Sequence, residues 1–139
     1  MKSDTQTVVL DTSRDQLFDF LASPENLPKW AVKFCHSIRK KERDWWLVTG
    51  CLGEVPVRYE SDRRTGVIDF HIATPHGKAV VPSRVVPAGR GAAYVFTQFQ
   101  AEWMPDPAFL EQVESLKEEL LVLKGLLETK ERSPAGKKA

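Results

Sequence analysis

Proton transfer near neutral pH could come from three histidines and two tyrosines in this chain. His36 is the histidine that strand alternation places on an inward face, together with Phe34 and Ile38. A tyrosine across from it, Tyr59 or Tyr94, could polarise a ligand carbonyl while the imidazole takes a proton. If the protein is an enzyme, His36 with one of these tyrosines is predicted to be catalytic, and the simpler alternative is a hydrogen-bonded core histidine.

Asp69 and His71 lie two residues apart, which places their Cα atoms about 7 Å apart on the same face of a strand. At that spacing they could share a proton directly or through a water molecule. The apolar residues Ile68, Phe70 and Ile72 alternate with them and are predicted to point inward. The sequence therefore favours two solvated residues on the outer face over a catalytic pair.

Arg84 is a basic residue that could face inward from a strand, where it would suit a ligand carboxylate. Its face would be shared with Val80, Pro82 and Val86. The opposite face is equally acceptable inside and consists of Ala79, Val81, Ser83 and Val85. An unpaired buried cation is costly, and the sequence leaves the orientation of Arg84 open. His76 lies in the turn TPHG and is predicted to be solvated.

Several chemistries are not supported by any motif. The chain has no glycine-rich phosphate loop, no HExxH, no CxxC and no GxSxG, so neither a metal nor a cofactor is predicted. Cys35 and Cys51 are expected to be reduced residues in or near the core.

Twenty basic and nineteen acidic residues nearly cancel, which argues against a nucleic-acid partner. A polar N-terminus and the lack of a long apolar run predict a cytoplasmic protein without membrane insertion.

The element best placed to cover a binding site is an amphipathic helix predicted over residues 107–130. Its apolar residues recur at steps of three and four, and at about 1.5 Å per residue the helix is roughly 36 Å long. Such a stripe needs an apolar partner of similar length, which points to a curved sheet. The stripe consists of Phe109, Val113, Leu116, Leu120, Leu123 and Leu127.

The preceding residues alternate as strands do, apart from two short helical segments near the N-terminus. A strand is predicted over 5–11, a helix over 14–22 and a helical turn in LPKWAVK. Six strands joined by short turns then follow as an antiparallel meander, over 34–40, 45–50, 55–61, 67–73, 78–86 and 92–100. Residues 131–139 are small, polar or charged and are predicted to form a disordered tail.

This order of elements, with VLDTSRDQLFDFLASPENLPKWA near the N-terminus, resembles the START-like or SRPBCC superfamily, in its polyketide cyclase/dehydratase and lipid-transport branch. The stretches LVTGCLGEVPVRYESDRRTGVIDFHI and VPSRVVPAGRGAAYVFTQF resemble the middle of small bacterial members. The resemblance implies an α+β helix-grip fold, in which a long C-terminal helix lies across a seven-stranded curved antiparallel sheet. Residues 1–130 would form a single START-like ligand-binding domain.

Alternation and the helix stripe select the side chains expected to face a cavity between the sheet and the helix. Trp46 is chosen over Trp45 because it alternates with Val48, and the face of the last strand that contains Tyr94 is preferred. The predicted ligand-binding residues are Trp30, Phe34, His36, Trp46, Val57, Tyr59, Phe70, Ile72, Phe96, Gln98, Leu116, Leu120 and Leu123.

Three functions from different classes follow. The preferred one is binding of a small hydrophobic or amphipathic ligand under the terminal helix. The second is a cyclase or dehydratase that acts on an aromatic polyketide-like substrate in the same cavity. The third is a dimeric interaction module without small-molecule chemistry, and monomer and homodimer both stay open.

Overall fold

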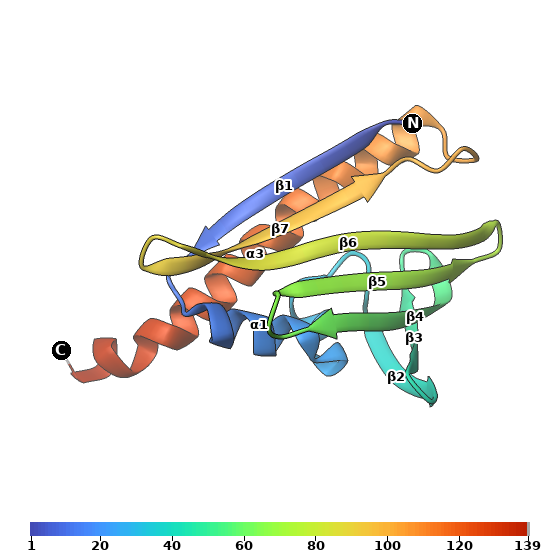
Figure 1. The fold of residues 1–139 in the computed structure, drawn as a ribbon. Coiled ribbons are helices and arrows are strands. Elements are labelled where there is room, and N and C mark those ends of the chain that lie inside the picture. The colour runs from blue at the N-terminus through green and yellow to red at the C-terminus, as the bar shows by residue number, and fades with distance from the viewer. Residues whose placement is uncertain (139) are drawn as a thin grey trace.

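Within the described part of the chain, seven strands form one antiparallel sheet in the order β1-β7-β6-β5-β4-β3-β2 (Figure 1). The computed structural model describes the backbone of residues 1–138 and the side chains of residues 1–128. The predicted six-strand meander is confirmed, because each strand from β2 to β7 pairs with the next one along the chain. The strands are β1 (Ser3–Leu10), β2 (Ser37–Glu42), β3 (Trp45–Gly50), β4 (Gly53–Asp62), β5 (Val67–Thr74), β6 (Gly77–Ala88) and β7 (Gly91–Phe99).

Three short helical segments connect β1 to β2. Ser13 caps the first of them, because its side-chain oxygen accepts a hydrogen bond of 3.1 Å from the backbone N–H of Gln16. The apolar face predicted for this helix is buried, with Leu17, Phe18 and Leu21 all less than 5% exposed. The segments are α1 (Arg14–Ala22), the 3₁₀ helix η1 (Pro24–Asn26) and α2 (Leu27–Trp30).

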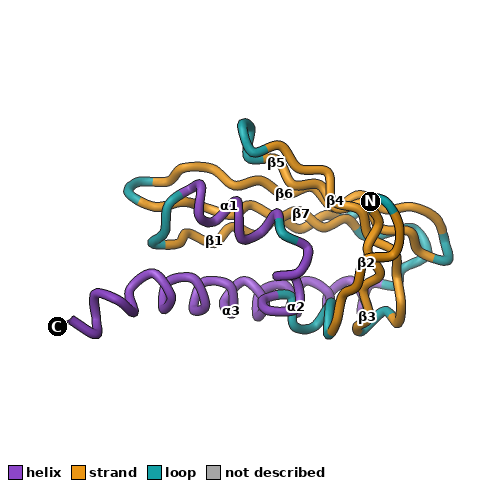
Figure 2. Tube along the Cα trace, turned by 90° about the horizontal axis from the view of Figure 1, so that it is seen from below, coloured by secondary structure: helices purple, strands orange, loops and turns teal. Residues whose placement is uncertain are grey.

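The long helix α3 (Asp106–Lys138) runs along one side of the sheet, as Figure 2 shows. Its backbone continues beyond the predicted end at Lys130. The side chains of residues 129–139 lie outside the described part, and a disordered tail over 131–139 stays a prediction. The predicted stripe is buried at Phe109, Leu116, Leu120, Leu123 and Leu127 and half-buried at Val113. These findings confirm the α+β helix-grip fold.

Two polar contacts attach α3 to the end of β1. The Oε2 atom of Glu128 accepts a 2.8 Å hydrogen bond from the backbone N–H of Asp11. Lys124 donates to the same carboxylate and to the carbonyl oxygen of Val9. The apolar stripe and these bonds together fix the position of α3 relative to the sheet.

The sheet divides between β6 and β7. These two strands pair from Ala88 and Gly91 as far as Ser83 and Phe96, and their described pairing stops there. Beyond that point β6 stays paired with β5 and β7 stays paired with β1, so the two strands diverge, as Figure 1 shows. Pro82 stands at the point of divergence, where its lack of an N–H limits further pairing.

Candidate functional site

Five aromatic side chains meet on the inward face of the sheet. Trp30 of α2 makes edge contacts with Tyr94 and Phe96, at ring-centroid distances of 5.9 and 6.5 Å. Phe96 lies 6.0 Å from Phe70, and Phe70 lies 4.9 Å from Tyr59. Edge-to-face and tilted contacts at these distances stabilise a core beyond the burial of area alone. The aromatic cluster thus links α2 to strands β4, β5 and β7.

Most of the predicted ligand-binding residues are found on this inward side, in two degrees of burial. Some are almost completely buried: Trp30, Val57, Phe70, Gln98, Leu116, Leu120 and Leu123. Others border the core and keep part of their surface accessible: Phe34, Trp46, Tyr59, Ile72 and Phe96. The second set is better suited to touch a ligand, because its members have uncovered apolar surface.

Trp46 faces inward, as predicted. It pairs across the sheet with Val57, whose side chain is fully buried, and paired residues share a face. The ammonium group of Lys40 lies 5.1 Å from the centre of its ring. Trp45 faces outward beside Arg58, whose guanidinium lies 5.9 Å from the Trp45 ring.

The inward placement of His36 is wrong. β2 begins only at Ser37, and residues 32–34 form a turn, so alternation counted back from Ile38 does not extend to His36. The His36 backbone N–H donates to the carbonyl oxygen of Thr49, while its side chain is exposed and that of Cys35 is buried. His36 is therefore not placed to act on a ligand in the interior.

Tyr94 is fully buried and its hydroxyl is already used. It donates a 2.9 Å hydrogen bond to Oγ of Ser83, which in turn donates a 2.6 Å bond to the carbonyl oxygen of Ile68. Burial raises the pKa of Tyr94, and the bond to Ser83 opposes that effect only partly. Tyr94 thus serves as a structural tyrosine rather than a free acid.

Tyr59 differs from Tyr94 because its buried hydroxyl has no hydrogen-bond partner among the described residues. Burial raises its pKa well above the usual tyrosine value, and the neighbouring Tyr94 and Cys35 add to the effect. The Nε2 atom of Gln98 is the other buried side-chain nitrogen or oxygen without a partner in the described part. The two polar groups that could meet a ligand are therefore Tyr59 and Gln98.

The contrast between the two tyrosines predicts opposite responses to loss of the hydroxyl. Tyr94→Phe should lower the free energy of unfolding by about 1 kcal/mol, because a buried hydrogen bond is lost. Tyr59→Phe should leave stability unchanged or raise it, since it removes a buried group that makes no bond. Urea unfolding of both variants checks this, and equal losses would contradict the assignment.

Sequence reasoning missed Glu119, a carboxylate that is only 6% exposed. Its Oε2 atom accepts hydrogen bonds of 3.0 and 2.9 Å from the backbone N–H groups of Lys33 and Phe34. Burial raises its pKa, and these two bonds oppose the rise. The sequence feature that could have identified Glu119 as buried is its spacing. It stands three residues after Leu116 and four before Leu123, which places it on the apolar face of the helix.

The other polar candidates lie outside the core. His71 makes a 2.8 Å contact with Glu60 across the outer face, and Asp69 shares that face, so their outward placement is confirmed. Arg84 is exposed and its Nε donates to the carbonyl oxygen of Thr65, which resolves its open orientation as outward. In the described part of the chain, no group of three or more His, Cys, Asp or Glu side chains could hold a metal ion.

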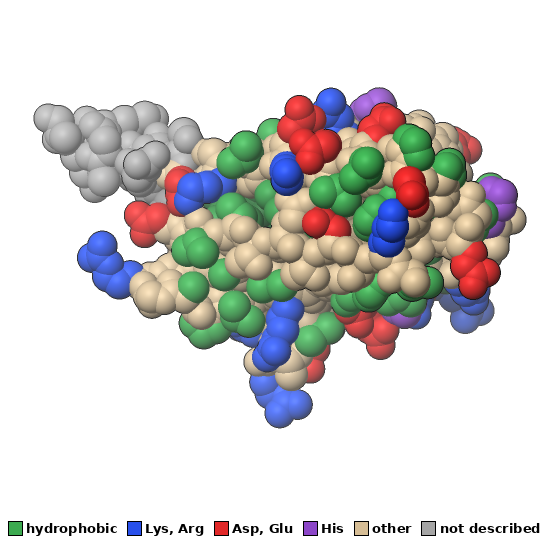
Figure 3. Space-filling model, turned by 90° about the horizontal axis from the view of Figure 1, so that it is seen from above, with side chains coloured by type: hydrophobic (Ala, Val, Ile, Leu, Met, Phe, Trp, Pro, Cys, Tyr) green, Lys and Arg blue, Asp and Glu red, His purple; other side chains and the backbone are tan. Residues whose placement is uncertain are grey.

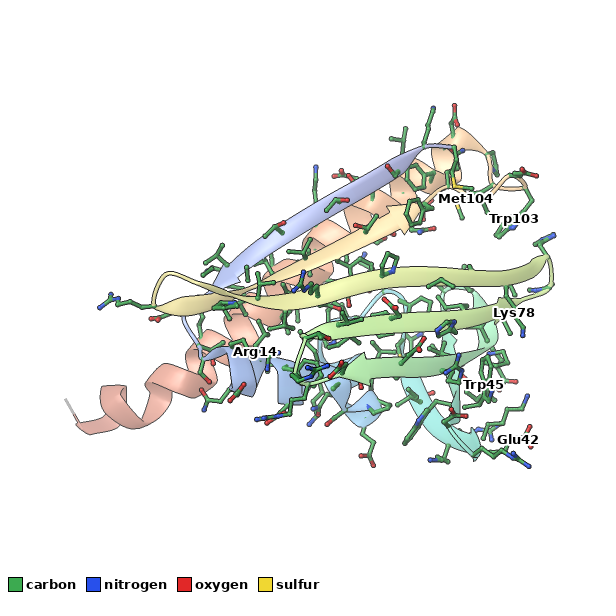
Figure 4. All side chains as sticks on the ribbon, in the orientation of Figure 1. Arg14, Glu42, Trp45, Lys78, Trp103 and Met104 are labelled. Carbon is green, nitrogen blue, oxygen red and sulfur yellow. The ribbon has the colours of Figure 1, made fainter. Side chains whose placement is uncertain are left out.

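His76 is exposed, as predicted, but it also contacts Trp103, a residue that sequence reasoning missed. The two rings stack at a centroid distance of 4.3 Å, which joins the turn between β5 and β6 to the loop before α3. Figure 4 labels Trp103 on this loop and Lys78 at the start of β6, on the same side of the molecule. The stack bridges the end of the sheet where β6 and β7 have separated.

Comparison with known proteins shows similarity in structure only. No family model matches the sequence, and no curated protein matches it. The Aha1 dimer from Colwellia psychrerythraea superimposes with a TM-score of 0.72 at 15% identity, covering 92% of this chain and 97% of that one. The protein Ara h 8.0201 gives a TM-score of 0.68 at 14% identity, with coverage of 90% of this chain and 96% of that one.

The chain has the Bet v 1-like, or SRPBCC, fold. The di-domain ARO/CYC protein BexL, from the BE-7585A biosynthetic pathway, shares this SRPBCC fold with a TM-score of 0.73 at 17% identity. The match covers 92% of this chain and 47% of BexL. The fold recognised from the sequence is thus confirmed over about nine-tenths of its length. None of the helices in the described part combines the length and the apolar character that a membrane span requires.

Proposed function

We propose that the protein binds a small hydrophobic or amphipathic molecule against the inward face of the sheet, under α3. The observation that carries this proposal is a set of inward apolar side chains that pack against the core but are only partly buried. They include Phe34, Ile38, Tyr59, Ile72, Val81 and Phe96. Apolar surface on the concave side of a sheet gains free energy when a ligand removes it from water.

The opening in the sheet supports the proposal. Val81 and Phe96 lie on the two sides of the point where β6 and β7 separate, so uncovered apolar surface coincides with the break in strand pairing. On the face seen in Figure 3, charged side chains of both signs are dispersed among apolar ones, so this face shows no continuous basic surface for a nucleic acid.

Binding of a neutral apolar dye tests the proposal. Nile red should bind the protein saturably, with a rise in dye fluorescence, and Phe96→Ala should weaken binding about tenfold because it removes an inward aromatic surface. Phe99→Ala is the matched control, since Phe99 belongs to the same strand but is 45% exposed on the outer face. If Phe96→Ala and Phe99→Ala weaken binding of the dye equally, the dye does not bind at the inward face.

Catalysis in the same region is less well supported. The predicted base, His36, lies outside, and the hydroxyl of Tyr94 is committed to Ser83. Among the described inward groups, Tyr59 alone of the predicted catalytic residues is left, and a cyclase or dehydratase needs a group that accepts a proton as well as one that donates it. The geometry therefore favours binding over a reaction on an aromatic polyketide-like substrate.

A homodimer is the second candidate, and the outer face of α3 favours it. Leu121 is 68% exposed there, and Leu110, Val122 and Leu126 are also exposed. Such apolar side chains often mark protein interfaces, and the Colwellia Aha1 protein is described as a dimer. Native mass spectrometry of the purified protein separates the functions: a retained small molecule supports ligand binding, and a dimer without one supports an interaction module.

A further inference from the structure

Two buried polar groups of the inward face have no partner, whereas their neighbours do. The hydroxyl of Tyr59 and the Nε2 atom of Gln98 make no hydrogen bond in the described part, and Gln98 is only 4% exposed. By contrast, Tyr94 donates to Ser83, and Gln6 donates to the carbonyl oxygen of Val113. Because a buried donor without an acceptor is costly, such groups in a folded protein call for a partner that is not a part of the chain.

The two groups lie in one row across the sheet. Tyr59 pairs with Phe70, and Phe70 pairs with Val81. Gln98 lies on β7 two residues past Phe96, beyond the last described pair of β6 and β7, so it lies on the far side of Val81 from Tyr59. Because β6 and β7 have diverged there, the Cα atoms of Tyr59 and Gln98 are further apart than the roughly 14 Å of three paired strand spacings. A ligand in contact with Phe70 would therefore have one donor toward each end.

The charges around this row disfavour an anion. Among the described side chains, the buried polar or charged residues include no lysine, arginine or histidine, while Glu119 is a buried carboxylate. Asp4 pairs with Gln98 and is half-buried, so it places an acidic group at one end of the row. Lys40, which pairs with the inward Trp46, is exposed, and its ammonium group lies over the Trp46 ring. A buried carboxylate without a cation loses its hydration and gains no compensating attraction.

We propose that the ligand is a neutral molecule with an apolar, ring-containing body and an acceptor oxygen at each end, bound by the Tyr59 hydroxyl and the Gln98 amide. This proposal rests on the proposed binding function and narrows its ligand class. Carbonyl oxygens of ketones, quinones or esters fit both donors. Fatty acids do not, because the described core offers no buried cation to balance their carboxylate and Asp4 lies beside Gln98.

Three naphthalene probes of the same shape test the ligand class. They are 2,6-dimethylnaphthalene, which has no acceptor, 2,6-diacetylnaphthalene, which has two, and 6-acetyl-2-naphthoate, in which a carboxylate replaces one acetyl group. Affinities at pH 7 are measured by quenching of tryptophan fluorescence. The diacetyl probe should bind at least fivefold more tightly than the dimethyl probe, and the naphthoate at least tenfold more weakly than the diacetyl probe.

Two variants assign the effect to the named residues. Tyr59→Phe and Gln98→Leu should each weaken binding of the diacetyl probe about fivefold and leave the affinity for the dimethyl probe unchanged. Thermal melts establish that both variants are folded. If the dimethyl probe binds but the two carbonyls add nothing, or if the naphthoate binds best, the inference is wrong and Tyr59 and Gln98 contact only water. If none of the three probes binds the wild-type protein, the proposed function itself fails.

Discussion

Leu120→Asp should lower the free energy of unfolding by about 3–5 kcal/mol, a large part of the stability of a domain of this size. Leu120 is 4% exposed and belongs to the stripe with which α3 covers the sheet. An aspartate there would either keep its charge without a partner or take up a proton at a cost in free energy. Equilibrium unfolding in urea, followed by tryptophan fluorescence, measures the loss.

Leu121→Asp is the matched control, because the neighbouring Leu121 is 68% exposed. A surface substitution of this kind should change the free energy of unfolding by no more than about 0.5 kcal/mol. The comparison is made at a protein concentration at which native mass spectrometry shows a monomer, so that a dimer through α3 does not contribute. A Leu120→Asp variant with wild-type stability would show that α3 does not close the core.

The sequence predicts most of the fold because its elements are regular. In β5, and in β4 from Val55 to Tyr59, apolar residues occupy every second position, so the inward placement of Val57 and Phe70 follows from the spacing of two. In β7 both faces carry apolar residues, and the burial of Tyr94 confirms the face that was preferred. The pairing of Trp46 with Val57 confirms a choice that rested on one alternating neighbour, Val48. In α3, the buried stripe is read directly from steps of three and four.

Prediction fails where the regular pattern stops. Alternation was extended to His36, although the strand begins one residue later and a turn precedes it. The stack of His76 on Trp103 joins two loops that are far apart in the chain, and no local pattern encodes such a contact. The separation of β6 from β7 arises because β6 stays paired with β5 while β7 stays paired with β1. It therefore depends on the shape of the whole sheet and not on the sequence of either strand alone.

Glu119 lies between these cases, because its position follows from helical spacing whereas its role requires the tertiary structure. It accepts hydrogen bonds from the backbone of Lys33 and Phe34, in the loop between α2 and β2. Glu119→Leu should lower the free energy of unfolding by about 2–4 kcal/mol, because both N–H groups would lose their acceptor. Glu119→Gln keeps an acceptor oxygen and should retain the wild-type fold.

The pH dependence of stability gives a sharper test of Glu119. Burial is the largest influence on its pKa and raises it, so the folded protein keeps this proton to a higher pH than the unfolded chain does. The contribution of Glu119 to stability is therefore complete below the ordinary glutamate pKa and decreases as the pH rises through the folded value. Glu119→Gln removes this decrease, so the stability of the variant relative to wild type should increase from pH 4 to pH 7.

Urea unfolding of wild type, Glu119→Gln and Glu119→Leu at several pH values in this range measures the effect. Glu114→Gln is the matched control, because the side chain of Glu114 is 68% exposed and forms an ion pair with Lys117 at the surface of the same helix. If Glu119→Gln follows the wild-type pH profile, the carboxylate of Glu119 is hydrated in solution. Its bonds to Lys33 and Phe34 would then not hold the loop against α3, and the uncovered surface of Phe34 would depend on other contacts.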